Sequence, residues 1–98
     1  RTNDSCPTHY FATAEIKQSV ISNGCIIEGT VINSIVGRGC VIKKGTVIKN
    51  SVILPSSYIE EGIHVENYVV GKHSKVLHCK ELVADAETPG YVRRGDTL

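Results

Sequence analysis

The sequence repeats itself every 17 residues, and this period constrains the fold more than any other feature of the chain. Ser34-Ile35-Val36 recurs as Ser51-Val52-Ile53 and again as Tyr68-Val69-Val70. One unit upstream, residues 19–27 match residues 34–42 at a spacing of 15. Self-similarity at a fixed period indicates a repeat architecture, in which each unit packs mainly against its neighbours.

The large aliphatic residues of the repeat are spaced six, six and five positions apart. An amphipathic helix would require spacings of three and four, and a β-hairpin sheet would require strict alternation. A step of about six residues instead suits one short strand plus one corner. After three such steps the chain returns to a position above its start. The spacing therefore predicts an all-β fold, a left-handed parallel β-helix of the hexapeptide-repeat type. The expected inward ladder is Ile21, Ile27, Ile32, Val36, Ile42, Ile48, Ile53, Ile59, Val65, Val70 and Val76.

Small residues recur at the positions where such coils must turn. Glycine adopts positive φ without steric cost, and Asn tolerates the left-handed region better than most residues. Another column recurs four residues after a ladder position and holds only small side chains, which predicts a crowded site near a corner. The corner residues are Gly24, Gly39, Gly45, Gly62, Asn50 and Asn67, and the small column is Cys25, Cys40, Ser57 and Ser74.

The repeat divides the chain into three parts. We expect a lead-in or cap over residues 1–15, a parallel β-helix of about four coils over residues 16–83, and a C-terminal tail over residues 84–98. The open ends of a solenoid leave unpaired strand edges, so both flanks are expected to act as covers. The chain contains no Met, and we expect it to be a fragment of a larger protein.

Composition argues against several classes of partner. The net charge of +1 provides no strongly basic field for nucleic acid or an anionic membrane. No apolar run is long enough for a membrane span, and no signal peptide is recognisable. Cys25 and Cys40 could in principle form a bridge between adjacent coils. We favour buried core thiols in a reduced, cytoplasmic protein, and the lack of a CxxC motif gives little support for zinc.

Four histidines and one arginine pair are the remaining candidates for chemistry. His73 and His78 lie five residues apart, a spacing similar to that of γ-class carbonic anhydrases, and His64 and His9 are further candidates. No carboxylate is placed to orient a ligating histidine, so solvated or interface histidines are the preferred interpretation. The pair Arg93-Arg94 could hold a phosphorylated ligand or an acidic surface, although we favour solvated tail charges.

No catalytic constellation is recognisable in the sequence. There is no nucleophile–base pair and no Gly-rich loop suited to phosphates, because the glycines are spaced for β-helix corners. We therefore assign no catalytic, cofactor-binding or metal-binding residue to these 98 positions.

Several segments resemble one particular β-helix family. They are Ser22-Asn23-Gly24-Cys25-Ile26-Ile27-Glu28-Gly29-Thr30-Val31 with the following Asn33-Ser34-Ile35-Val36, the lead-in Pro7-Thr8-His9-Tyr10-Phe11, and Gly45-Thr46-Val47-Ile48-Lys49-Asn50-Ser51-Val52-Ile53. Together they resemble the C-terminal β-helix domain of bacterial ADP-glucose pyrophosphorylase (glucose-1-phosphate adenylyltransferase), over roughly residues 7–98. The tail, residues 89–96, is more similar to the regulatory GlgD-type subunit of low-GC Gram-positive bacteria than to the catalytic GlgC-type subunit.

This resemblance implies a function in glycogen biosynthesis. In the family, an upstream nucleotidyltransferase domain makes ADP-glucose from ATP and glucose 1-phosphate with magnesium, and the β-helix domain serves subunit assembly and the allosteric response to sugar phosphates. We expect a non-catalytic assembly and regulatory domain whose partners are that upstream domain, which binds ATP and magnesium, and other subunits of the enzyme. The alternatives are a fragment of a trimeric hexapeptide acyltransferase and a γ-carbonic-anhydrase-like metal enzyme.

Overall fold

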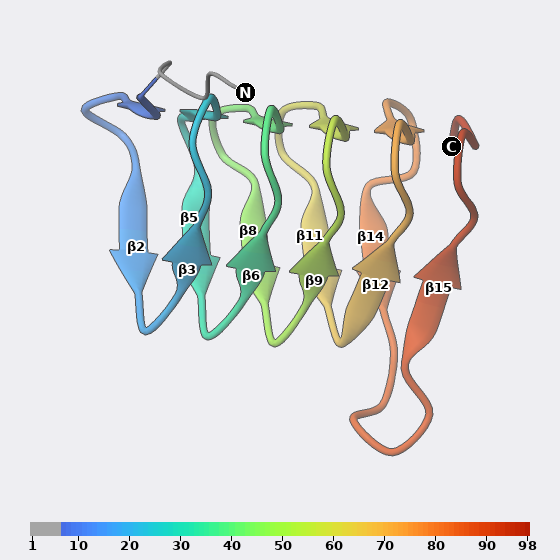
Figure 1. Ribbon diagram of the computed structural model, residues 1–98. Coiled ribbons are helices and arrows are strands. Elements are labelled where there is room, and N and C mark those ends of the chain that lie inside the picture. Colours follow the sequence, from blue (N-terminus) through green and yellow to red (C-terminus); the bar gives the residue numbers. More distant parts are fainter. Residues whose placement is uncertain (1–6) are drawn as a thin grey trace.

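The computed structural model describes residues 7–98, which form a left-handed parallel β-helix (Figure 1). Fifteen short strands wind around one axis, and the described residues include no helix and hence none that could cross a membrane. In Figure 1 the strands on the near side run upwards, the strands behind them run downwards, and the coils advance to the right. This sense of winding agrees with the left-handed β-helix predicted from the repeat.

Every third strand belongs to the same sheet, so the solenoid has three faces of five parallel strands each. The first sheet contains β1 (His9–Tyr10), β4 (Ile26–Ile27), β7 (Val41–Ile42), β10 (Tyr58–Ile59) and β13 (Lys75–Val76). The second contains β2 (Glu15–Lys17), β5 (Thr30–Ile32), β8 (Val47–Lys49), β11 (His64–Glu66) and β14 (Glu81–Val83). The third contains β3 (Val20–Ile21), β6 (Ile35–Val36), β9 (Val52–Ile53), β12 (Tyr68–Val70) and β15 (Gly90–Val92).

Four complete turns run from β2 to β13, which agrees with the predicted number of coils. Strand pairing also continues into both flanks. In the predicted lead-in, β1 pairs with β4, and in the predicted tail, β15 pairs with β12. Residues 1–6 of the lead-in, including Cys6, lie outside the described residues.

The core is a stack of aliphatic side chains, one from each coil on each face. The fully buried ladder contains Ile27, Val31, Val36, Ile42, Ile48, Ile53, Ile59, Val65, Val70 and Val76. This confirms the predicted ladder from Val36 onward. Ile21, at the first coil, is only partly buried, and Leu82 and Val92 extend the ladder into the last coil.

One ladder position was predicted wrongly. Val31, not Ile32, is the inward residue of β5, because Val31 pairs with Ile48 and Ile32 pairs with Lys49. The corner between β4 and β5 is two residues shorter than its counterparts, so the missing residues of the 15-residue unit fall before this strand. Gly29 permits the short corner, since a Cβ there would lie 2.5 Å from the carbonyl oxygen of Thr46.

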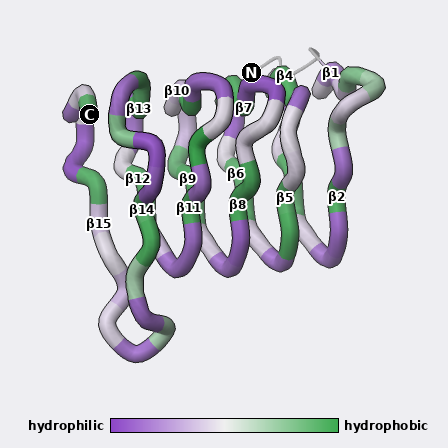
Figure 2. Tube along the Cα trace, turned by 180° about the vertical axis from the view of Figure 1, so that it is seen from behind, coloured by the Kyte–Doolittle hydropathy of each residue, from purple (hydrophilic) through white to green (hydrophobic). Residues whose placement is uncertain are grey.

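The corners use positive φ as the sequence predicted, but not only at glycine and asparagine. Gly39, Gly45 and Asn50 are among the confirmed positions, whereas Ser56 (φ 65°) and His73 (φ 58°) were not foreseen. Between the second and third sheets the corners form a hydrophilic edge along the solenoid (Figure 2). There the amide of Asn33 donates to Asn50 Oδ1 at 2.7 Å, linking adjacent coils.

The column of Cys25, Cys40, Ser57 and Ser74 is buried and small, as predicted. Each of these side chains donates a hydrogen bond to a carbonyl oxygen of the next coil, for example Cys40 Sγ to Leu54 O at 3.2 Å and Ser57 Oγ to Gly71 O at 2.9 Å. Cys25 and Cys40 are free thiols. The hydrogen bond with Cys25, together with burial, raises the pKa of the Cys40 thiol well above its usual range. The small column therefore has a structural role, because its hydrogen bonds join adjacent coils.

The ladder gives a direct mutational test of the fold. Ile42→Asp should abolish folding, because it places a carboxylate in a fully buried aliphatic stack without a hydrogen-bond partner. Ile26→Asp is the matched control, since Ile26 lies on the outer face of the same sheet and is 38% exposed. Circular dichroism should show loss of β-structure only for the first variant. A soluble Ile42→Asp protein with an unchanged spectrum would contradict the register.

The small column gives a second test. Cys40→Ser should change the free energy of unfolding by less than about 1 kcal/mol, because serine makes the same inter-coil bond at positions 57 and 74. Cys40→Leu should destabilise by about 1–3 kcal/mol, since a larger side chain overpacks the site. Urea denaturation of both variants measures the difference. Equal stability of the two would show that the column is not sterically restricted.

Candidate functional site

The outer face of the third sheet carries an uninterrupted apolar row. One outward residue from each strand aligns with its neighbours in register, so the row runs the full length of the solenoid. Val20, Ile35 and Tyr91 are 62%, 50% and 60% exposed, and the other two residues of the row, Val52 and Val69, are partly buried. The apolar row consists of Val20, Ile35, Val52, Val69 and Tyr91.

The other two faces are less apolar. The outward residues of the first sheet begin at His9 and end at Lys75, with Ile26, Val41 and Tyr58 between them. Each strand of the second sheet carries at least one polar or charged residue on its outer face. The third sheet is therefore the face with the least affinity for water.

The corner between the third and first sheets is basic. Arg38, Pro55, Lys72 and Arg94 stack in successive coils, as shown by hydrogen bonds from Ser56 N to Arg38 O (2.9 Å), His73 N to Pro55 O (3.2 Å) and Gly95 N to Lys72 O (2.8 Å). We call Arg38, Lys72, Arg93 and Arg94 the basic corner.

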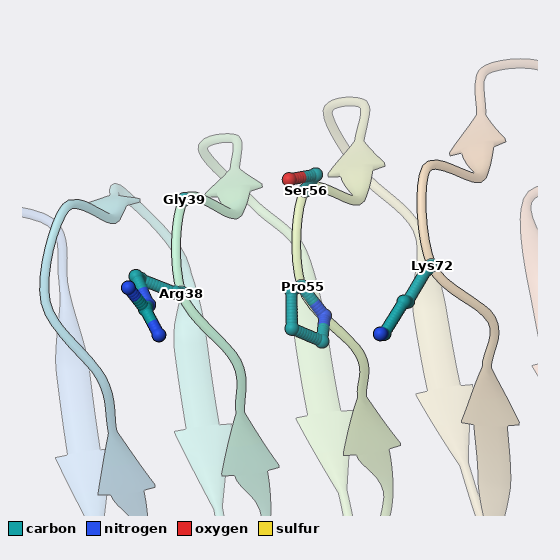
Figure 3. A pocket seen from close by; sticks show the side chains of 5 residues that line it. All are labelled: Arg38, Gly39, Pro55, Ser56 and Lys72. Atoms are coloured by element: carbon teal, nitrogen blue, oxygen red, sulfur yellow. The ribbon is translucent and has the colours of Figure 1, made fainter. Parts of the chain in front are cut away.

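A shallow hollow of about 390 Å³ lies on this corner. Arg38 and Lys72 lie on the two sides of Pro55, and Ser56 lies beside it (Figure 3). Gly39 completes the lining, so the hollow carries two cations and no carboxylate. Its chemistry suits an anionic group, whether on a small molecule or on a protein surface.

The corner between β14 and β15 carries an acidic loop, defined as residues 84–89. It has six residues, whereas the equivalent corners between the second and third sheets have one or two. The loop extends beyond the edge formed by those corners (Figure 1). Asp85 and Glu87 are exposed, and neither forms an ion pair with another described residue.

The structure does not gather the candidate histidines into a metal site. His9, His73 and His78 are exposed. The expectation that no carboxylate lies beside a histidine was wrong for His64, whose Nε2 lies 3.3 Å from Glu66 Oε1. Among residues 7–98, no group of three or more His, Cys, Asp or Glu side chains could hold a metal ion. His73 instead occupies a corner, where its backbone N–H bonds to the preceding coil.

The arginine pair has a structural context that the sequence interpretation missed. Arg93 and Arg94 follow β15 and continue the column of Lys72. The sequence does contain a signal for this stacking, because residues 91–95 (Tyr91-Val92-Arg93-Arg94-Gly95) align position by position with residues 69–73 (Val69-Val70-Gly71-Lys72-His73). The acidic loop lengthens that spacing to 22 residues and hides it from a search at a period of 17.

Comparison with known proteins agrees with the fold. The GlmU-like C-terminal hexapeptide family matches residues 8–89. The chain is 34% identical to the glycogen biosynthesis protein GlgD of Bacillus subtilis over 97% of its own length and 28% of that protein. It is 35% identical to the glucose-1-phosphate adenylyltransferase of Desulfitobacterium hafniense over 76% of its length and 19% of that enzyme. It is also 47% identical to GlgD of Geobacillus stearothermophilus over 48% of its length and 14% of that protein.

The extent of these matches determines what they establish. The chain spans less than a third of the length of each of these relatives, so their similarity concerns one part of a longer protein. The match to the hexapeptide family, by contrast, covers the lead-in strand and every complete turn of the solenoid. The chain therefore belongs to the family of GlmU-like C-terminal hexapeptide domains.

Proposed function

We propose that this chain is the non-catalytic assembly and regulatory domain of a glucose-1-phosphate adenylyltransferase subunit of the GlgD type, acting in ADP-glucose synthesis for glycogen. The observation that carries the proposal is the match to Bacillus subtilis GlgD over 95 residues, because it runs through nearly the whole solenoid. The 47% identity to the Geobacillus GlgD protein supports the GlgD assignment.

The geometry of the solenoid supports a non-catalytic role. The inward positions are taken by the aliphatic ladder, and the small polar residues beside it bond to carbonyl oxygens of adjacent coils. Side chains available for recognition are therefore outward-facing and spread over nearly flat surfaces. Catalysis requires several groups that converge on one reacting atom, which such surfaces do not favour.

The same geometry supports a role in assembly. Single exposed hydrophobic residues are common on protein surfaces, but an aligned row across five strands is typical of an interaction face. Under this proposal the domain is part of a cytoplasmic enzyme whose nucleotidyltransferase domain binds ATP and magnesium. We propose that both cofactors bind to that upstream domain and not to the solenoid.

A purified sample of the 98-residue chain tests the non-catalytic assignment. With ATP, glucose 1-phosphate and magnesium it should form no ADP-glucose above the rate without protein, and calorimetry should detect no ATP binding. The Desulfitobacterium hafniense enzyme serves as the positive control for the assay. Turnover by the isolated chain that disappears in an Ile42→Asp variant would overturn the proposal.

The acyltransferase alternative has its own signature. A hexapeptide acyltransferase of this size would be a trimer with an acyl-CoA groove between subunits. Sedimentation analysis and coenzyme A titration separate the two functions, because the proposed domain should not bind coenzyme A. A trimer that binds coenzyme A would replace the proposed function with that alternative.

A further inference from the structure

We infer that the outer face of the third sheet binds a second copy of this chain, forming a twofold dimer in which the acidic loop of each copy lies against the basic corner of the other. This inference deepens the proposed assembly function and rests on it for its biological purpose. The apolar row forms the centre of the interface, and the charged segments form its rim. This is the usual arrangement of a specific protein interface.

The symmetry follows from the shape of the solenoid. We place the twofold axis just outside the third sheet and parallel to the solenoid axis. Rotation about this axis keeps each strand at the same level, that is, at the same position along the solenoid, and reverses the direction in which the strand runs. Each residue of the apolar row then meets its own counterpart, for example Val52 against the partner's Val52 and Tyr91 against the partner's Tyr91. Such an isologous contact closes after two copies.

The reversal also brings opposite corners together. The corner that leads into each strand of the third sheet meets the corner that leaves the same strand in the partner. At the level of β15 the leading corner is the acidic loop, and the leaving corner carries Arg93 and Arg94. At this level Asp85 and Glu87 therefore oppose Arg93 and Arg94 on each side of the twofold axis, and Asp96 follows the two arginines in the same corner. None of the side chains of Asp85, Glu87, Arg93 and Arg94 forms an ion pair within the described residues.

The remaining levels contain no opposition of like charges. At the level of β12, Glu66 and Asn67 oppose the partner's Lys72. At the level of β9, Lys49 and Asn50 oppose the partner's Pro55, and at the level of β6, Asn33 opposes the partner's Arg38. Opposite charges thus meet at the levels of β15 and β12, whereas at the levels of β9 and β6 a charged residue meets neutral ones. Because like charges across an interface are strongly unfavourable, this pattern favours a second copy over an unrelated partner.

The size of the face sets the expected strength. The apolar centre of the face consists of the five residues of the apolar row, which is small beside the roughly 20–30 residues a side of a standard stable interface. Five strands at the usual spacing also limit the face to about 24 Å along the axis. We therefore expect a dimer that dissociates at micromolar concentrations, with electrostatic contacts that weaken as the salt concentration rises.

Sedimentation velocity over a range of protein concentrations tests the dimer. At a protein concentration of about 100 μM the unmodified chain should be mostly dimer, as expected for a small interface. Ile35→Lys should raise the dissociation constant of the dimer at least tenfold. Lys44→Glu is the matched control, because Lys44 is exposed at the corner between the first and second sheets. Circular dichroism of each variant verifies that the fold is retained.

A charge-reversal pair identifies the orientation. One variant reverses the acidic loop (Asp85→Lys with Glu87→Lys), and the other reverses the last part of the basic corner (Arg93→Glu with Arg94→Glu). Each variant alone should lose at least tenfold in association, whereas an equal mixture should form a heterodimer with near-original affinity. Rescue by mixing requires contact between the loop of one copy and the corner of the other.

Each remaining outcome has a defined meaning. A chain that stays monomeric at all concentrations, or a dimer insensitive to Ile35→Lys and to charge reversal, would overturn this interface. Either result leaves the proposed function intact if the chain also lacks ADP-glucose synthesis and coenzyme A binding. A trimer that binds coenzyme A would instead overturn the proposed function itself.

Discussion

The structure depends on backbone hydrogen bonds that run from each coil to the next. Val41 N donates to Ser57 O, and Tyr58 N donates to Ser74 O, so the main chain of one coil is satisfied only by its neighbours. Equivalent residues must then stack at the strand spacing of about 4.8 Å. A position that is buried in one coil is therefore buried in the next, and this requirement produces the 17-residue repeat in the sequence.

The same stacking explains why function resides on the outside. An inward position admits an aliphatic residue such as Ile48 or a small hydrogen-bond donor such as Ser57, and either choice is imposed by the coils above and below. Outward positions carry no such restriction. Side chains chosen there align into columns, so the solenoid displays rows of like chemistry, and the apolar row and the basic corner are two of them.

The sequence predicted the features that the repeat determines and missed those that interrupt it. The inward register from Val36 to Val76 follows from the period alone. Val31 was missed because valine and isoleucine are adjacent, and only the shortened corner at Gly29 decides which faces inward. The stacking of Arg94 on Lys72 was hidden by the acidic loop. The positive φ of Ser56 was missed although Ser56 lies 17 residues after the corner glycine Gly39, because serine by itself does not indicate that conformation.

The acidic loop also explains why association should occur at a side of the solenoid and not at its end. No described strand lies beyond β14 and β15, and such edges can recruit further strands. Head-to-tail pairing of the two ends repeats without closing and leads to fibres, whereas a twofold contact closes after two copies. Two carboxylates and Pro89 lie between these last strands, where charge and a missing N–H group oppose the addition of a regular coil. One insertion thus both limits growth along the axis and supplies the charge that the side-by-side contact requires.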